Sequence, residues 1–407
     1  MWKVDACPCC GSTGVEAKGY RMPGMHVMGR YHCSECTTWF LHDLPVGFGV
    51  DRPMVILERD GSVLDPGGES PWLRMPLERS FRMPEQRSVQ VERVVNRSCN
   101  RVVVLNTLDF LYGHVLLKLF NAHHYLDQHP DLGLVVIVPR MFAWLVPEGV
   151  AEAWVVDVKL GEGQSWFTGL EHWFADRLAE YDEVDFARAY AHPEFAPIQI
   201  ERFTGCLPFP LDVYADRTPC FTLVLREDRL WYRSWSSKQA HRATRRLGLR
   251  KLLHRLWLTD QHRLVRTFVG ELRRRLPNAR FQAVGLGRPG GLGSRVEDLR
   301  TERMDEATER RWCAAYAASH VVIGVHGSNM ILPTAHAAGC IEILPYDRYE
   351  NIVQDISVRY EDRLQLFHYR FVDEFAGPND VARHAVSMIT DQHVFFRDNR
   401  TNVFPRS

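Results

Sequence analysis

The segment VVIGVHGSNMILPTAHAAGCIEILP, residues 321–345, decides how the rest of the chain is interpreted. Two apolar runs, 321–325 and 340–344, have the length and composition of buried strands. Between them lie small and polar residues and a short apolar segment that ends at Gly339. A strand, a short helix and a second strand in this order form the repeating unit of a parallel α/β sheet. Glu342 requires an explanation, because a carboxylate inside a buried strand needs a hydrogen-bond donor as its partner.

The polar residues of this segment fall where parallel sheets bind their ligands. His326 and Gly327 follow the first strand directly, at its carboxyl end. Ser328 and Asn329 are good N-cap residues for the helix that follows, and a helix N-terminus offers free N–H groups to an anion. A purely structural interpretation stays open, in which Glu342 pairs with an arginine and His326 bonds a nearby carbonyl group.

The alternation of strands and helices extends over most of the chain. Apolar runs predict strands at 101–107, 132–139, 152–158, 220–227, 279–287, 320–327 and 339–345. Periodic segments predict helices at 113–130, 260–276 and 304–319. The fold class is therefore α/β, with two Rossmann-like lobes that face a cleft and a small N-terminal module. The predicted bounds are a zinc ribbon at 1–45, an N-terminal lobe at 46–215, a C-terminal lobe at 216–385 and a tail at 386–407.

The composition excludes several classes of protein. The chain has 407 residues and a formal net charge of +0, which argues against a globally basic nucleic-acid binder. No run approaches the roughly 18 apolar residues of a membrane span, and the N-terminus has no apolar stretch of signal-peptide length. We therefore expect a cytoplasmic protein whose ten cysteines are reduced.

Cysteines are concentrated at the N-terminus in a pattern that predicts a metal site. Two C-x-x-C pairs supply four candidate ligands, Cys7, Cys10, Cys33 and Cys36. Four thiolates suit a structural Zn²⁺ ion in a zinc ribbon, and such a closed site leaves no position for substrate. Cys9 is expected to be a bystander, although it could replace a neighbour, and a cysteine-rich turn without metal is the alternative. His26, between the pairs, is expected at the surface.

The motif GVHGSN, followed by a short helix, a glycine and EILP, resembles the signature of glycosyltransferase family 61. The residues that match are Gly324, His326, Gly327, Asn329, Gly339, Glu342 and Pro345. Only Ser328 stands between Gly327 and Asn329, so the loop is shorter than in the family pattern, which suggests a divergent bacterial branch. The resemblance covers residues 50–385, most convincingly 304–356. The sequences LVLREDRLW (223–231) and LDFLYGHVLLKLF (108–120) resemble further family motifs.

This resemblance implies an inverting transferase of the GT-B type that needs no catalytic metal and binds a nucleotide-sugar on its C-terminal lobe. Arg226, Arg229, Ser328 and Asn329 would then face the diphosphate. His326 would hold the diphosphate or the donor sugar, with Gly327 beside it, and Glu342 would bind the ribose hydroxyls. The base that deprotonates the acceptor would be His114 or Asp109 on the N-terminal lobe. Arg226 and Arg229 could equally form a solvated turn.

The stretch 229–259 contains nine lysines and arginines and no acid, together with Leu249, Leu252, Leu253 and Leu256 on one helical face. It is a candidate for peripheral contact with an anionic membrane, at the inner face, or for binding a phosphate-bearing lipid-linked acceptor. A packed helix with a solvated basic face is the alternative. A nucleic-acid patch is disfavoured, since no nucleic-acid motif accompanies the stretch.

The sequence therefore predicts a transferase of polysaccharide biosynthesis that moves a hexosyl or pentosyl group to a glycan, a glycolipid or another hydroxyl acceptor. The glycines of VGLGRPGGLG (284–293) keep an S-adenosylmethionine-dependent methyltransferase as an alternative, although no strand–GxGxxG–helix unit is present. A non-catalytic zinc-ribbon adaptor with a degenerate transferase body is the other alternative.

Overall fold

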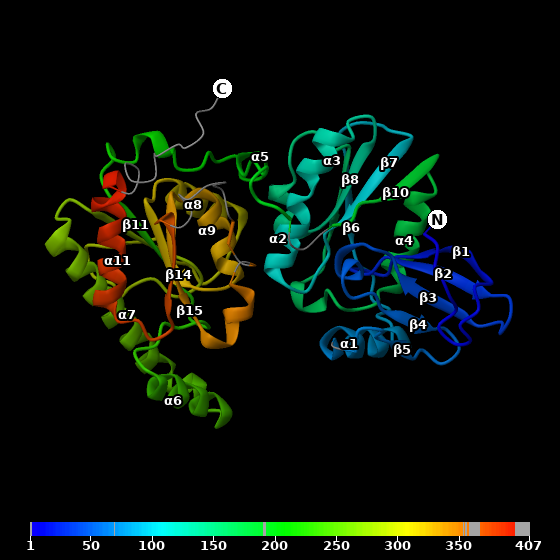
Figure 1. The fold of residues 1–407 in the computed structure, drawn as a ribbon, viewed down its shortest axis with the longest axis horizontal. Coiled ribbons are helices and arrows are strands. Elements are labelled where there is room, and N and C mark those ends of the chain that lie inside the picture. Colours follow the sequence, from blue (N-terminus) through cyan, green and yellow to red (C-terminus); the bar gives the residue numbers. More distant parts are fainter. Residues whose placement is uncertain are drawn as a thin grey trace. The chain divides into compact units, whose positions relative to one another are not determined.

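The computed structural model describes residues 2–68, 70–189, 193–352, 354, 356–357 and 367–394 (Figure 1). The chain divides into two compact units, Met1–Glu194 and Phe195–Ser407. The division falls before the boundary that the sequence predicts at residue 215, because Tyr214 and the residues preceding it pack on the second unit. How the two units face one another stays a prediction, as do the domain bounds.

The first sheet of unit 1 is an antiparallel meander that carries the cysteines. Its strands are β1 (Val15–Arg21), β2 (Met28–Cys33), β3 (Trp39–Asp43), β4 (Val55–Leu57) and β5 (Val63–Leu64), paired in that order. The sheet therefore continues beyond residue 45, the predicted end of the ribbon. His26 is not at the surface: it is buried, and its Nδ1 lies 3.0 Å from Oδ1 of Asp43.

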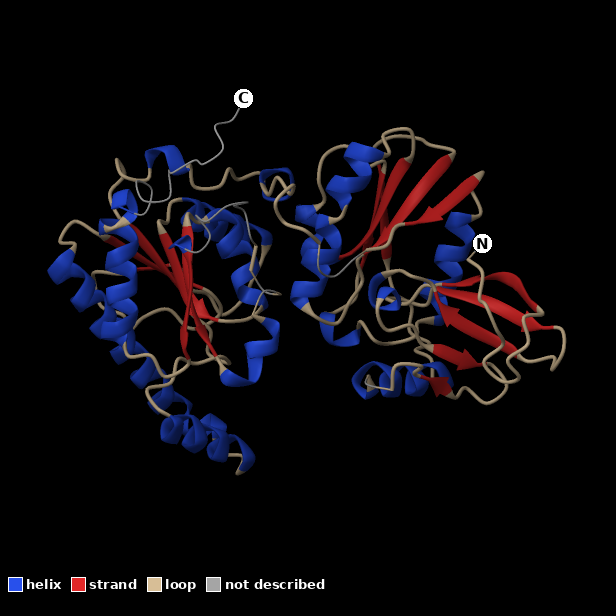
Figure 2. Cartoon of the chain, viewed as in Figure 1, coloured by secondary structure: helices blue, strands red, loops and turns tan. Residues whose placement is uncertain are grey.

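The second sheet of unit 1 is mixed. Its strands are β6 (Val91–Val95), β7 (Arg101–Asn106), β8 (Gly133–Pro139), β9 (Glu152–Val156) and β10 (Glu183–Phe186), in the order β10-β7-β8-β9-β6. All pairs are parallel except β6 with β9. The helices are α1 (Pro71–Arg82), α2 (Tyr112–Phe120), α3 (Ala122–Gln128) and α4 (Thr168–Leu178), with short 3₁₀ turns η1 (Gly47–Val50), η2 (Arg140–Leu145) and η3 (Leu160–Glu162). Figure 2 shows helices on both sides of this sheet, and every residue of β8 and β9 is buried.

Unit 2 holds a six-stranded parallel sheet. Its strands are β11 (Cys220–Val224), β12 (Arg280–Val284), β13 (Glu297–Asp298), β14 (Val321–Val325), β15 (Gly339–Leu344) and β16 (Tyr369–Asp373). Their order is β13-β12-β11-β14-β15-β16. Numbered along the chain within the unit, this is 3-2-1-4-5-6, the order of the Rossmann fold. The prediction of two α/β sheets is confirmed.

Helices cover both faces of this sheet in Figure 1, with α7 and α11 on one side and α8 and α9 on the other. The helices of the unit are α5 (Glu201–Thr204), α6 (Trp235–Arg246), α7 (Arg250–Arg275), α8 (Glu306–Ala317), α9 (Ile331–His336) and α11 (Pro378–Thr390), and the 3₁₀ turns are η4 (Leu211–Val213), η5 (Ser328–Met330) and η6 (Tyr346–Asn351). Phe268 of α7 and Ala382 of α11 are fully buried against the strands. In the described part of the chain, no helix combines the length and apolar character that crossing a membrane requires.

Buried histidines attach the segment before β11 to the sheet. The ring of Tyr214 lies 4.8 Å from that of His320 and 5.2 Å from that of His368, measured between centroids. The Nδ1 atom of His320 accepts a bond from the backbone N–H of Cys220, and its Nε2–H donates to the carbonyl oxygen of Tyr214 at 3.0 Å. These partners require a neutral ring. Burial lowers the pKa of His320 to about 4, and that of His368 likewise to about 4.

The stability of the chain should therefore fall when the pH is lowered from about 6.5 to about 4. In that window the unfolded state binds protons at these histidines that the folded state does not, so the unfolding free energy rises with pH. Each histidine would account for a loss of up to about 3 kcal/mol. Chemical denaturation at several pH values should show this slope, and His320→Gln should flatten it. The exposed His172→Gln is the matched control; an equal slope in all three proteins would contradict the assignment.

Candidate functional site

The strand order of unit 2 places a crevice at one point of its sheet. β11 and β14 are neighbours, and the chain leaves them in opposite directions, toward β12 and toward β15. Ligands of open α/β sheets bind at such a switch point, outside the carboxyl ends of the strands. Here β11 leads into a turn at residues 226–229, and β14 leads into His326 and Gly327. A cavity of about 30 Å³ lies at this edge, lined among others by Arg226, Glu227, Arg229, His262, Arg300 and Gly324.

His326 and Glu342 form a buried pair under this edge. Nδ1 of His326 bonds Oε2 of Glu342, and both side chains are fully buried. Nε2 of His326 lies 3.2 Å from the carbonyl oxygen of Asn351. Both ring nitrogens of His326 therefore lie within hydrogen-bonding distance of an oxygen atom, which gives each of these buried side chains a polar partner. The sequence assigned these residues to the donor, but neither side chain reaches solvent here. Within the described residues, the carboxylate of Glu342 meets His326.

Arg229 occupies the surface of the switch point. Its Nη1 donates to the carbonyl oxygen of His326 at 2.6 Å. Gly327 makes this approach feasible: its φ is +146°, and a Cβ atom there would overlap Nη1 of Arg229. The other predicted arginine is engaged locally, because Arg226 donates twice to the carboxylate of Asp228, at 2.8 and 2.7 Å. The structure thus brings Arg229 to His326 and Gly327 and pairs Arg226 within its own turn.

Ser328 and Asn329 do not cap a helix as the sequence predicts. They lie half-buried in the turn η5, the helix α9 begins only at Ile331, and its N-cap residue is Met330. No side chain caps this six-residue helix. The chain first forms a 3₁₀ turn after Gly327, which moves the helix start beyond both polar residues. Ser328 and Asn329 still border the switch point, but neither side chain caps α9.

Sequence reasoning missed Arg300 and its partners. Arg300 is buried, donates to both carboxylate oxygens of Asp298 at 2.8 and 2.7 Å, and donates to the carbonyl oxygen of Gly290. The N–H of Gly290 in turn bonds Asp298. The glycine-rich segment is therefore fixed against β13 rather than forming a dinucleotide-binding turn. The only sequence signal was the pair of opposite charges, Asp298 and Arg300, at the end of a short strand. In a single sequence, such a pair cannot be distinguished from charged residues of a solvated loop.

His114 and Asp109 lie together in unit 1, past the carboxyl end of β7. Oδ2 of Asp109 is 2.7 Å from Nζ of Lys118 and 3.7 Å from Nδ1 of His114. Burial alone would raise the pKa of Asp109, but the charge of Lys118 and the proximity of His114 outweigh burial and lower this pKa. Asp109 is fully buried, whereas the side chain of His114 is 21% exposed. Of the two predicted bases, only His114 can meet a substrate in this arrangement.

His114 contacts one ring of an aromatic group formed by Phe48, Trp72 and Phe110. The ring centroid of Phe48 lies 5.2 Å from that of His114 and 5.4 Å from that of Trp72. Phe110 lies 6.1 Å from Trp72 and 6.2 Å from Phe48. Trp72 remains partly exposed. The histidine therefore stands at the edge of an aromatic surface, the kind of surface on which apolar or sugar faces pack.

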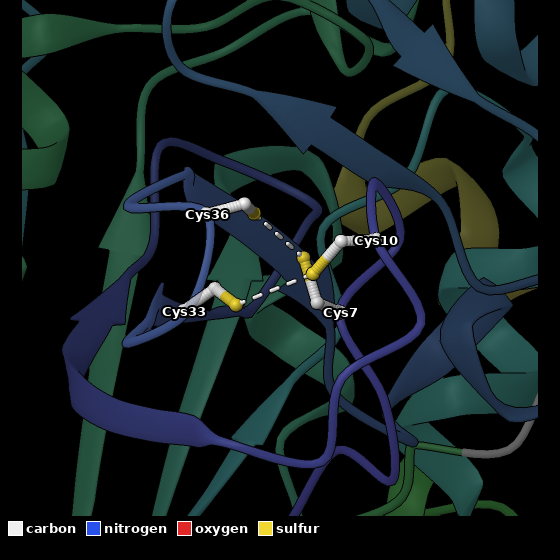
Figure 3. A group of neighbouring side chains, drawn as sticks. All are labelled: Cys7, Cys10, Cys33 and Cys36. Carbon is white, nitrogen blue, oxygen red and sulfur yellow. Dashed lines mark hydrogen bonds between the residues drawn. The ribbon is translucent and has the colours of Figure 1, made fainter.

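The four predicted cysteine ligands converge on one point (Figure 3). Sγ of Cys7 lies 3.6 Å from that of Cys36, Sγ of Cys10 lies 3.7 Å from that of Cys33, and all four atoms lie within 4.8 Å of one another. Sulfurs placed tetrahedrally at about 2.3 Å from zinc are about 3.8 Å apart, so the set fits Zn²⁺. Hydrogen bonding to Thr38 lowers the pKa of Cys36 to about 6, whereas burial raises the pKa of Cys7.

No family model and no curated protein matches the sequence. The solved structures found by comparison of the fold include two proteins. One is the heptosyltransferase WaaC of E. coli with ADP, with 16% identity and a TM-score of 0.35 over 74% of this chain and 99% of that chain. The other is OtsA in its apo form, with 8% identity and a TM-score of 0.24 over 72% of this chain and 78% of that chain. Both scores are too low to carry an argument, so function must be argued from the residues and the strand order.

Replacing Cys33 by serine should remove the metal. With one of four thiolates lost, zinc measured by inductively coupled plasma mass spectrometry on the purified protein should fall from near-stoichiometric to a small fraction, and thermal stability should fall with it. Cys9→Ser is the matched control, because Cys9 is exposed and does not join the cluster. Loss of zinc in Cys9→Ser and retention in Cys10→Ser would show that Cys9 is the ligand instead.

Gly327→Ala should destabilise the chain by about 1–3 kcal/mol, through its positive φ and the overlap with Arg229. Removing the arginine relieves the overlap, so the double variant Gly327→Ala, Arg229→Ala should lose less than the sum of the two single losses. Urea denaturation measures all three. Gly161→Ala, at a glycine where a Cβ meets nothing, is the control. Strictly additive losses of unfolding free energy would mean that the position of Arg229 does not require a glycine at position 327.

Proposed function

We propose that the chain is a nucleotide-sugar-dependent glycosyltransferase, inverting, of the GT-B type, related to glycosyltransferase family 61 and without a catalytic metal. The observation that carries the proposal is the switch point of unit 2. A sheet in Rossmann order presents an arginine, Arg229, at the carboxyl ends of its central strands, next to the residues that resemble the family signature. The glycosyltransferase assignment rests on that resemblance, and the geometry supports a nucleotide site.

The donor would lie on unit 2. A departing nucleoside diphosphate accumulates negative charge, which fixed cations and N–H groups stabilise when no metal is present. Arg229 would meet this charge directly, with Arg226 after release from Asp228 and with Ser328 and Asn329 along the turn. His326 and Glu342 would act indirectly: their pairing would fix the carbonyl group of His326, which accepts a hydrogen bond from Arg229. This differs from the direct ribose and phosphate contacts that the sequence suggested.

The acceptor would lie on unit 1. A hydroxyl oxygen of the acceptor attacks the anomeric carbon opposite the diphosphate; the new C–O bond forms, the bond to the phosphate oxygen breaks, and His114 takes the hydroxyl proton. Asp109 would orient the imidazole and stabilise its charged form, while Lys118 keeps Asp109 ionised. The aromatic surface of Phe48, Trp72 and Phe110 suits a glycan or glycolipid acceptor. A place in bacterial polysaccharide biosynthesis follows from the resemblance.

Nucleotide binding tests the proposal first. The full chain is screened by thermal shift against UDP, GDP, CMP, ADP, dTDP and S-adenosylhomocysteine, each with and without EDTA. We expect one nucleoside diphosphate to raise the melting temperature even in EDTA, because a ligand that binds only the folded state stabilises it. Arg229→Gln should weaken that binding about tenfold to a hundredfold, the loss of one or two charge-assisted bonds.

The matched control is Arg383→Gln, at an exposed arginine on α11. A response to S-adenosylhomocysteine alone would replace glycosyl transfer by methyl transfer. Binding of a nucleotide that depends on EDTA-sensitive metal would contradict the metal-independent site. If Arg229→Gln and Arg383→Gln bind the nucleotide equally well, the switch point is not the donor site.

A further inference from the structure

An apolar surface is exposed on the αα-hairpin formed by α6 and the start of α7. Five large apolar side chains make up this hairpin patch: Trp235, Leu247, Leu249, Leu252 and Leu256. The exposed fractions of Leu252, Leu247 and Trp235 are 75%, 71% and 64%. Exposed apolar side chains scattered singly need no explanation, but a group of this size in one short stretch marks an interaction surface.

The patch faces away from the core that α7 helps to build. Leu249, Leu252 and Leu256 are spaced three and four residues apart and so share one side of the helix. The residues of α7 that enter the core of unit 2 begin only at Leu264. Figure 1 shows α6 and the adjoining end of α7 extending beyond the sheet and its other helices. The apolar side of the hairpin therefore contributes nothing to the core of its own unit.

Positive charge surrounds the patch. Arg242, Arg245, Arg246 and Arg255 are exposed on the same two helices, and the stretch 229–259 contains no acid. Arg245, Arg246 and Arg255 form no ion pair with any residue that the structure describes; the side chains of residues 250 and 251 lie outside that description. Each of these guanidinium groups is available to an external anion.

The turn η6 adds aromatic side chains at the edge of the patch. Its Tyr346 is 86% exposed, and Tyr349 is exposed as well. Carboxylate oxygens of Asp347 lie 3.8 Å from Nζ of Lys238 and 3.6 Å from Nη2 of Arg242, which places η6 beside α6. Exposed tyrosines near basic side chains are typical of the boundary between water and a bilayer.

The combination fits one kind of partner best. Apolar side chains flanked by arginines are complementary to an anionic bilayer. Leucine and tryptophan enter the region where the acyl chains begin, and arginine binds lipid phosphate. A nucleic acid would leave the leucines uncovered. A symmetric contact with a second copy would bring the arginine cluster against itself. We propose that the hairpin patch docks the protein on the surface of an anionic membrane, with α6 and the first turns of α7 lying in the interface.

Vesicle co-sedimentation of the full chain tests this proposal and does not depend on enzymatic activity. The vesicles are phosphatidylcholine alone and an equimolar mixture of phosphatidylcholine and phosphatidylglycerol. We expect binding to the mixture, little binding to phosphatidylcholine, and weaker binding as salt increases. Leu252→Glu with Leu256→Glu should reduce the partition coefficient about a hundredfold, and Arg245→Glu with Arg246→Glu at least about tenfold.

Two controls separate the patch from general effects. Leu207→Glu places a charge at a leucine that is 73% exposed elsewhere in unit 2, and Arg303→Glu reverses an exposed arginine outside the hairpin. Both should bind like the wild-type chain, and all variants should keep its melting temperature. The proposal is overturned if the chain does not bind the mixed vesicles, or if the control variants lose as much binding as the patch variants. It is also overturned if light scattering shows a dimer that the leucine substitutions convert to monomer, since the patch would then be the contact with a second copy.

Discussion

The buried pair of His326 and Glu342 is the constraint around which the proposed donor edge is arranged. Removing polar or ionisable side chains from water is costly, and only close pairing with additional hydrogen bonds offsets that cost. Here the imidazole bonds the carboxylate on one side and the carbonyl group of Asn351 on the other. Because Glu342 lies within β15 and His326 directly after β14, the pair fixes the ends of two neighbouring strands. The carbonyl group of His326, which accepts a hydrogen bond from Arg229, is thereby held in place. The position of Arg229 therefore depends on the buried pair.

Unit 1 also contains a buried carboxylate that is paired with a neighbouring side chain. Asp109 is buried with Lys118, whose Nζ also donates to the carbonyl oxygen of Leu108 at 3.1 Å. Oδ1 of Asp109 accepts the backbone N–H of Leu111. The loop after β7 is therefore bound to α2 at several points, and His114 projects from a rigid base. In both units a buried carboxylate and its partner lie at the edge of a sheet and determine where a more exposed side chain can point.

Local patterns predicted much of this architecture, and long-range partners account for most of what they missed. Apolar runs identified the strands β7, β8, β9, β11, β12, β14 and β15, but not the short strands β10 and β13. The spacing of Cys7, Cys10, Cys33 and Cys36 predicted their cluster. Both signals are contained within a few residues. The burial of His26 depends on Asp43, and the fixed glycine segment depends on Asp298 and Arg300. The sequence likewise could not show that Glu342 faces His326, since the side of a strand on which a fully buried residue points has no periodic signature.

The pairing of β11 with β14 also affects how the protein is made. Phe221 pairs with Val321, so the central ladder of unit 2 joins segments separated by 100 residues. At synthesis rates of about 5–20 residues per second, roughly 5–20 s separate the emergence of these two strands from the ribosome. During that interval β11 is an apolar strand with an unpaired edge, which is prone to associate with other chains. The arrangement that places Arg229 beside Gly327 thus exposes the nascent chain to aggregation, and chaperone binding at β11 would protect it until β14 arrives.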